Sequence, residues 1–227
     1  PYTIPDDVPN FVMDNKDDSL LTQSGFLNNG EYNSYRFLDH SVGLFLKAAK
    51  KSSYFDNTLF VFFGDHGVPG TGKHISPSYS QLGLMNLNVP LIFYAPKLIT
   101  KPKQFNKVAS EVDLMPTIAA LVNQPYVNST LGRDLLDPQF DNLRYAFTVA
   151  HGTTQRIGLI SDRHYYQMDE SGKNKSLHDI NSQSPRKDIS AQYPAIQAHM
   201  DKLLQAINAT VNYMRYNNSK SHIQENQ

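Results

Sequence analysis

A short, unbroken apolar run in the first third of the chain dominates its hydrophobic pattern. Leu59 to Phe63 reads Leu-Phe-Val-Phe-Phe, and Gly64-Asp65-His66-Gly67 follows at once. The run is too short for a helix and rich in aromatic residues, so it predicts a strand buried on both faces, as in a parallel sheet. Residues 89–94, Val-Pro-Leu-Ile-Phe-Tyr, predict a second buried strand.

Apolar residues at three- and four-residue spacing predict three helices. They cover Glu31 to Lys51, Ser110 to Val122 and Ser190 to Tyr216. Ser110 can cap the second helix, and Asp113 suits its first turn as an N-terminal carboxylate. The first helix leads through a short turn into the Leu59–Phe63 strand, an order of elements that forms half of a βαβ unit.

The last third predicts short strands at residues 145–150, 155–161 and 164–169, separated by turns at His151-Gly152 and Ser161-Asp162. Residues 1–30, 74–87 and the tail after Asn217 are polar and predict irregular structure. We therefore expect an α/β fold with a mostly parallel sheet flanked by helices, a small C-terminal antiparallel sheet and a terminal helix. Residues 1–140 should form the core, with residues 141–227 packed on it.

Composition narrows the function classes. The 227 residues are 40% hydrophobic, enough for one substantial core, and their formal net charge of zero argues against a nucleic-acid partner. The chain has no cysteine, which excludes disulfides, thiolate zinc sites and a cysteine nucleophile. No apolar run reaches the roughly 20 residues of a membrane span, so any membrane link would have to come from an upstream segment.

Three interpretations compete for the residues after the first strand. Asp65 and His66 are two metal-ligand types at a strand end, with His74 eight residues later. Gly67 to Lys73 has the spacing of a phosphate-binding P-loop, but His74 replaces its Ser or Thr. Pro77 also argues against a helix opening there, because it disfavours helical geometry at Ser76. The third interpretation is a plain polar turn.

An ordered series of segments resembles the sulfatase branch of the alkaline phosphatase superfamily, including its lipoteichoic-acid-synthase-like members. The segments are Tyr35–Gly43 with Asp-x-x-Val-Gly, Phe55–Gly67 with the Gly-Asp-His-Gly motif, Val89–Pro96, Val112–Ile118, Gly132–Leu136 and Ser176–Ile180, and Pro1-Tyr2 is similar to the end of a His-x-Pro-Tyr segment.

The resemblance implies a metal-assisted displacement at a sulfate or phosphate ester, on a glycan or a lipid head group. By position, Asp65 and His66 would be ligands of a divalent metal, either Ca, Zn, Mn or Mg. His74 would be catalytic and, with Lys73, would bind an ester oxygen of the substrate. A solvated lysine is the alternative for Lys73. The family also implies a periplasmic or extracellular, membrane-anchored protein.

One part of the family pattern is missing from the sequence. The sulfatase signature, Cys or Ser followed by x-Pro-x-Arg, does not occur. We therefore expect this to be the C-terminal part of the domain, with the nucleophile upstream, and expect the chain alone to be inactive and to bind metal poorly. The alternatives are a phosphoglycerol or phosphoethanolamine transferase of the same fold, and a non-catalytic domain that binds a glycan or a protein.

Overall fold

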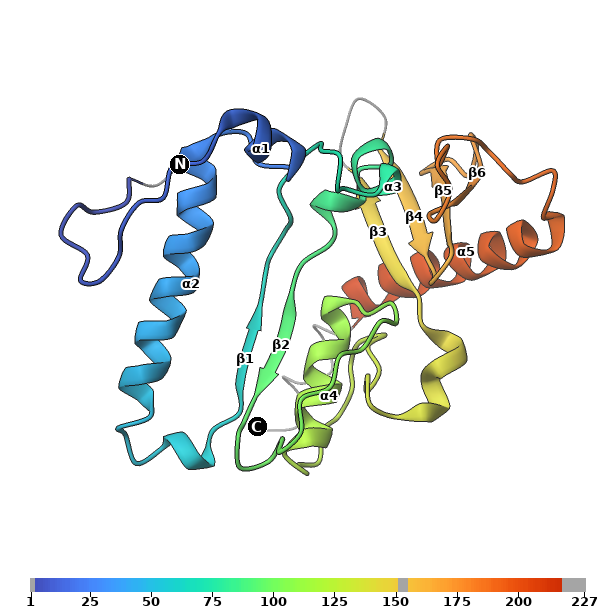
Figure 1. Cartoon of the computed structure of the whole chain (residues 1–227). Coiled ribbons are helices and arrows are strands. Elements are labelled where there is room, and N and C mark those ends of the chain that lie inside the picture. Colours follow the sequence, from blue (N-terminus) through green and yellow to red (C-terminus); the bar gives the residue numbers. More distant parts are fainter. Residues whose placement is uncertain (1–2, 151–154, 218–227) are drawn as a thin grey trace. The chain divides into compact units, whose positions relative to one another are not determined.

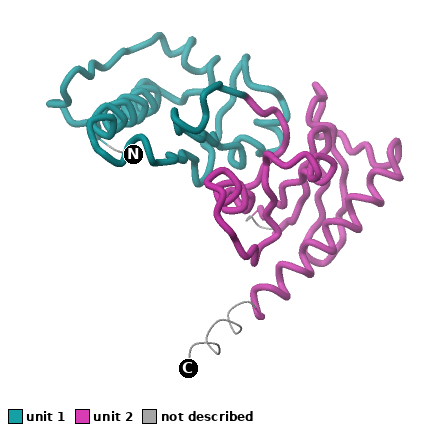
Figure 2. Tube along the Cα trace, turned by 90° about the horizontal axis from the view of Figure 1, so that it is seen from below, with its two compact units in different colours: residues 1–103 teal, residues 104–227 magenta. Residues whose placement is uncertain are grey.

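The computed structural model describes residues 3–150 and 155–217 (Figure 1). The chain divides into two compact units, Pro1–Lys103 and Gln104–Gln227 (Figure 2). The sequence analysis expected a core of residues 1–140 with residues 141–227 packed on it, and this domain organisation stays a prediction. Pro1-Tyr2, the His151-Gly152 turn and the tail after Asn217 lie outside the described residues. Among the residues described, no helix has the length and apolar character needed to cross a membrane.

The first unit is built on a long helix, α2, which spans Asn29–Ala49 and confirms the first predicted helix. Asn28 caps it, because its side chain accepts a hydrogen bond from Glu31 N. A shorter helix, α1, spans Asp18–Gln23, where we expected irregular structure. Its signal was local: Asp17 Oδ1 accepts from Ser19 N at 2.9 Å, which is an N-cap within a polar segment.

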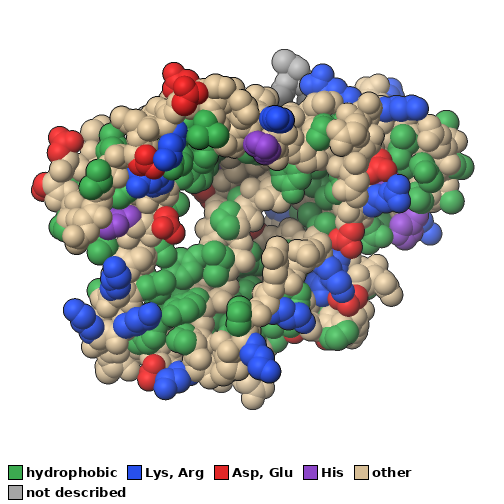
Figure 3. Space-filling model, viewed as in Figure 1, with side chains coloured by type: hydrophobic (Ala, Val, Ile, Leu, Met, Phe, Trp, Pro, Cys, Tyr) green, Lys and Arg blue, Asp and Glu red, His purple; other side chains and the backbone are tan. Residues whose placement is uncertain are grey.

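The two strands of this unit are β1, Phe60–Phe63, and β2, Leu91–Tyr94, and they pair antiparallel. The expectation of a mostly parallel sheet is therefore wrong for the strands that the structure describes. An apolar run reports burial, whereas strand direction is set by the connection, here residues 64–90. Burial is also one-sided: Phe60 is 8% exposed, but Phe63 is 53% exposed. Apolar side chains gather on the surface over α2 and beside β1 (Figure 3).

The connection between β1 and β2 contains two short helices rather than the loop we expected. Helix α3 spans Pro77–Gln81, and a 3₁₀ turn, η2, spans Leu84–Asn86. Proline is well suited to the first helical position, where its missing N–H costs nothing. Ser76 has the extended geometry that a following proline favours, with ψ of 136°. The expectation that no helix opens here was wrong, but the helix starts too late to follow a phosphate-binding loop directly.

The second unit centres on an antiparallel sheet in the order β3-β4-β5-β6. Its strands are β3 Ala146–Ala150, β4 Arg156–Ile160, β5 His164–Asp169 and β6 Ser176–Asp179, the last of which the sequence analysis missed. The terminal helix α5, Pro194–Asn217, packs against this sheet. Leu159, Tyr166, Leu177 and Leu204 are fully buried between them. The predicted antiparallel sheet and terminal helix are thus confirmed.

The remaining predicted helix is divided into a 3₁₀ turn, η3 Glu111–Asp113, and α4, Leu114–Leu121. Asp113 Oδ2 accepts a hydrogen bond from Ser110 N at 2.9 Å, so it is the N-terminal carboxylate we expected. Asp113 Oδ1 also accepts from Arg133 N at 2.8 Å. A last 3₁₀ helix, η4, spans Pro138–Leu143.

Candidate metal-binding site

The predicted metal ligands lie together in the loop that follows β1. Asp65 Oδ1 accepts a hydrogen bond from His66 N at 2.9 Å. His66 Nδ1 lies 2.9 Å from Gly67 O, and because a carbonyl can only accept, Nδ1 is the protonated nitrogen. This bond fixes the tautomer and leaves Nε2 with its lone pair free, as in metal-ligating histidines whose other nitrogen is held by a carbonyl.

The free donor atoms of this pair are close enough to share one ion. Asp65 Oδ2 lies 3.9 Å from His66 Nε2. Two metal–ligand bonds of about 2.1 Å each span at most about 4.2 Å, so the separation allows both atoms to contact the same cation. The side chains of Asp65 and His66 are 90% and 72% exposed, and a ligand can therefore reach both without displacing the core.

The backbone that carries the pair is held by close approach to two other segments. Gly67 N donates to Asn86 O at 2.9 Å, and a Cβ on Gly67 would lie 1.8 Å from Met85 O. A Cβ on Gly72 would lie 2.4 Å from Gln23 O. Only glycine permits these approaches. The exposed side chains of Asp65 and His66 therefore extend from a fixed loop. This favours binding, because the backbone loses little entropy when a ligand binds.

The other two predicted site residues, Lys73 and His74, are exposed on the same connection. His74 N donates to Gln23 O at 3.3 Å, which fixes the backbone but not the imidazole. In the described part of the chain, no hydrogen bond or ion pair joins the side chain of Lys73 or His74 to Asp65 or His66. The structure thus brings the two predicted metal ligands together, and the roles of Lys73 and His74 stay predictions.

The donor set fits part of a metal centre. Across residues 3–150 and 155–217, no group of three or more histidine and carboxylate side chains gathers in a way that could hold a metal. Catalytic zinc sites usually use three protein ligands and a water. A carboxylate oxygen and an imidazole nitrogen are nevertheless ligand types that first-row divalent metals use. Asp65 and His66 therefore fit as two ligands of a site that needs at least one more.

The sequence analysis overlooked a second set of polar residues, on α2. Asn33 and Arg36 lie three positions apart, so both side chains share one helix face, which is not the face of the apolar stripe. Asn33 is fully buried, and Arg36 lines a surface pocket. No local pattern could have revealed them, because both are polar residues outside the apolar stripe and their partners, Asp14 N and Val12 O, lie about 20 residues earlier in the sequence.

Comparisons with known proteins found a matching family model, curated relatives and similar solved structures. The model of the Sulfatase family matches residues 15–124. Over 109 residues the chain is 29% identical to GPI ethanolamine phosphate transferase 2 of Aspergillus fumigatus, an alignment that covers 43% of this chain and 14% of the transferase. Over 110 residues it is 30% identical to an arylsulfatase of Clostridium perfringens, with 47% of this chain and 22% of that enzyme covered.

The fold is also similar to a solved structure, the lipoteichoic acid synthase LtaP from Listeria monocytogenes. The TM-score is 0.55 at 20% sequence identity, and the match covers 80% of this chain and 45% of the synthase chain. At this identity the likeness concerns the fold alone. The chain thus spans less than a quarter of the two curated relatives and less than half of this solved chain.

Proposed function

We propose that this chain, whose residues 15–124 match the model of the Sulfatase family, supplies part of the active site of a metal-dependent hydrolase of sulfate or phosphate esters. One observation carries the proposal. Asp65 Oδ2 and His66 Nε2 stand 3.9 Å apart, exposed and free, on a glycine-fixed loop inside the matched segment. A plain polar turn needs neither a fixed histidine tautomer nor this separation.

In this proposal, Asp65 and His66 hold a divalent ion, which would neutralise negative charge on the transferred group. The contribution of the chain is to keep the two donors in place. The bond from His66 Nδ1 to Gly67 O orients the imidazole so that Nε2 is the nitrogen available to the ion. Ca, Zn, Mn and Mg are all candidates, with the imidazole favouring Zn over the other three.

Lys73 and His74 are proposed to bind the ester. Both side chains are exposed and follow the metal-ligand loop directly. A lysine ammonium donates up to three hydrogen bonds to sulfate or phosphate oxygens, and a protonated His74 could donate to a leaving oxygen. Such donors contribute most where negative charge grows in the transition state. The substrate in this proposal is an ester on a glycan or a lipid head group.

We propose that the nucleophile comes from sequence outside these 227 residues. Two observations support this. The sulfatase signature of Cys or Ser followed by x-Pro-x-Arg does not occur in them, and the chain covers only 45% of the solved synthase chain it resembles. A catalytic centre completed by other sequence also explains why the Asp-His pair has no third ligand among the described residues. Family resemblance further suggests a membrane-anchored protein in the periplasm or outside the cell.

A transferase is the second candidate, because the Aspergillus relative is named as an ethanolamine phosphate transferase. A phosphoethanolamine or phosphoglycerol transferase would use the same metal ligands, but the group would pass to a hydroxyl of an acceptor instead of water. A non-catalytic glycan- or protein-binding domain is a third candidate, and it would not need a metal at Asp65 and His66.

Metal binding tests the ligand assignment without any assay of turnover. We expect calorimetric titration of the 227-residue chain with Mn²⁺ or Zn²⁺ to show weak binding that Asp65→Asn or His66→Ala abolishes. The matched control is Asp56→Asn, another exposed carboxylate of the first unit, which pairs with Lys97 at 3.6 Å. Binding that survives both site substitutions, or is lost in the control as well, would contradict the assignment.

The reaction type requires the full-length protein. A hydrolase should release sulfate or phosphate from nitrophenyl esters, whereas a transferase should move the head group of phosphatidylethanolamine or phosphatidylglycerol to an acceptor. Both activities should fall at least about 100-fold in Asp65→Asn, as expected for a lost ligand of a catalytic metal. If neither ester class reacts and no metal binds through Asp65 and His66, the non-catalytic candidate is favoured over both enzymes.

A further inference from the structure

A surface pocket of about 480 Å³ lies between the N-terminal segment and α2 of the first unit. This volume falls within the usual range of small-molecule sites. Its walls come from residues 10–12, from Phe26 and from one face of α2 that carries Tyr32, Tyr35, Arg36, Asp39 and His40. Four phenylalanine or tyrosine rings, one guanidinium and one carboxylate thus line a single cavity. None of these residues belongs to the proposed metal site.

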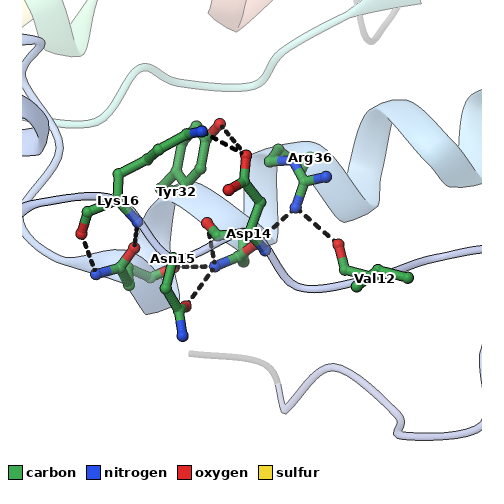
Figure 4. Close-up of polar contacts among 8 residues, drawn as sticks. Val12, Asp14, Asn15, Lys16, Tyr32 and Arg36 are labelled. Atoms are coloured by element: carbon green, nitrogen blue, oxygen red, sulfur yellow. Dashed lines mark hydrogen bonds and ion pairs between the residues drawn. The ribbon is translucent and has the colours of Figure 1, made fainter.

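Arg36 in this pocket has unused hydrogen-bonding capacity. Its Nη1 donates to Val12 O at 2.9 Å and to Asn33 Oδ1 at 2.8 Å, both of them uncharged acceptors (Figure 4). Of the five N–H groups of a guanidinium, those on Nε and Nη2 remain. These two nitrogens form the side-on fork that binds the two oxygens of a carboxylate.

The charge of Arg36 also lacks a counter-ion. Arg36 takes part in none of the ion pairs formed by the described residues, in contrast to Arg144 and Arg163, which pair with Asp141 and Asp179. The nearby carboxylate of Asp14 is already paired with Lys16 at 2.9 Å. That hydrogen bond to Lys16 lowers the pKa of Asp14, with Arg36 a weaker influence at longer range.

The guanidinium is fixed before any ligand arrives. Its carbon lies 5.4 Å from the ring centroid of Phe11 and 5.7 Å from that of Tyr32, at cation–π distances. Asn33, which is fully buried, accepts both from Arg36 and from Asp14 N, at 2.9 Å for the latter. Figure 4 shows the hydrogen bonds from Arg36 to Val12 and from Tyr32 to Asp14, which join the N-terminal segment to α2. Binding would therefore cost little side-chain entropy.

The remaining walls indicate a ring-shaped, hydroxylated ligand. The ring of Tyr35 is 46% exposed and rests on the edge of Phe26, with centroids 5.7 Å apart, which leaves a flat apolar platform open. Asp39 follows Arg36 by three positions on the same face, and its carboxylate can accept from hydroxyl groups. It would repel a doubly charged phosphate or a polyanion but tolerates one charge held on Arg36.

We propose that this pocket binds a sugar ring that carries a carboxylate. The carboxylate lies on Nε and Nη2 of Arg36, the apolar face of the ring lies on Tyr35, and a ring hydroxyl donates to Asp39. Nε and Nη2 can bind the two oxygens of a carboxylate in one bidentate pair.

The test uses the 227-residue chain and measures binding of glucuronic acid by NMR titration, beside glucose, glucose 6-sulfate, inorganic sulfate and a phosphoserine peptide. Glucuronic acid should bind most tightly. Arg36→Gln should weaken it at least about tenfold, the loss expected for hydrogen bonds to a charged group. Lys47→Gln, which removes an exposed charge from the same helix outside the pocket, should leave affinity unchanged.

Because Arg36 also contacts Val12 and Asn33, Arg36→Gln could disturb the fold. Two milder variants keep the test decisive: Arg36→Lys retains the charge but removes the fork, and Tyr35→Ala removes an exposed platform. Each should weaken binding at least about threefold, with an unchanged circular dichroism spectrum. Unchanged affinity in both, equal binding of glucose, or tighter binding of sulfate, sulfated sugar or phosphopeptide would overturn the proposal.

Discussion

The two sheets of this protein bury similar apolar sequences to very different extents. In the second unit, the four-stranded sheet and α5 bury Leu159, Tyr166 and Leu177 completely. In the first unit, the two-stranded sheet of β1 and β2 leaves Phe63 and Ile92 more than half exposed. An isolated two-stranded sheet is marginal in water, so β1 and β2 depend on packing against their surroundings.

The well-packed core and the candidate functional residues lie in different units. The unit with the complete core carries no predicted metal ligand, whereas the unit with the half-covered sheet carries Asp65, His66 and the Arg36 pocket. Side chains that must meet a ligand cannot be buried against their own chain. The first unit therefore does not enclose its functional groups. Close glycine contacts fix the backbone of the Asp65-His66 loop, and a hydrogen bond to Asn33 fixes Arg36.

The largest expected effect concerns the core of the second unit. Leu159→Ala should lower the free energy of unfolding by about 2–5 kcal/mol, because it leaves a cavity at a fully buried site. Ile92→Ala, at a site that is 54% exposed, should cost less than about 1 kcal/mol. Urea unfolding of both variants measures the contrast. Equal losses would mean that the β1–β2 face is covered as completely as the other core.

Gly67→Ala should have the next largest effect. The added Cβ would lie 1.8 Å from Met85 O, so the loop must move, at a cost of about 1–3 kcal/mol. Metal affinity should fall although neither ligand is changed. Gly43→Ala is the control, because nothing lies within 4 Å of its Cβ position and alanine favours a helix. Unchanged metal binding in Gly67→Ala would show that the loop does not position the ligands.

A smaller, pH-dependent effect is expected at Asp169 in the second unit. Asp169 Oδ1 accepts hydrogen bonds from the Ser171 hydroxyl and from Lys173 N, each at 2.7 Å. These bonds, the one from Ser171 most strongly, lower the pKa of Asp169 below its usual 3.8. A carboxylate with a lowered folded-state pKa stabilises the protein above the unfolded pKa, and this stability is lost as the pH falls through the folded pKa. Asp169→Asn should therefore be less stable than the parent at pH 7, and the gap should narrow below about pH 4 in thermal unfolding scans.

The smallest expected effect on stability is at the metal ligands themselves. Asp65→Asn and His66→Ala should each change the free energy of unfolding by no more than about 0.5 kcal/mol, because both side chains are largely exposed. The same substitutions should abolish metal binding. A large loss of stability in the metal-free protein would assign these residues to the fold and would remove the contrast between the two units.

Local sequence patterns predicted most of the elements. The spacing of apolar residues predicted α2 and α5, and short runs bounded by turns predicted β3, β4 and β5, because both signals arise within one segment. The Gly-Asp-His-Gly motif predicted that Asp65 and His66 would lie together at a strand end, and their adjacency made this nearly certain. Helix α1 was missed although its N-cap is local, because it is short and lies in a polar segment. Strand β6 was missed because it is short and is formed by pairing with β5.

Three features depended on the tertiary structure. The direction of β1 against β2 depends on how residues 64–90 return, and an apolar run carries no information on direction. The exposed state of Phe63 depends on what else covers the sheet. The pocket around Arg36 requires residues 10–12 to lie beside α2 through Asn33, a contact between positions 19 residues apart.

By itself, the sequence determined the secondary structure of the long elements, the family resemblance and the donor pair, because periodicity and adjacent motifs are local properties of a chain. The tertiary structure alone decided strand pairing, side-chain exposure and the neighbours of Arg36. These depend on contacts between distant residues, and no pattern within a single segment encodes them.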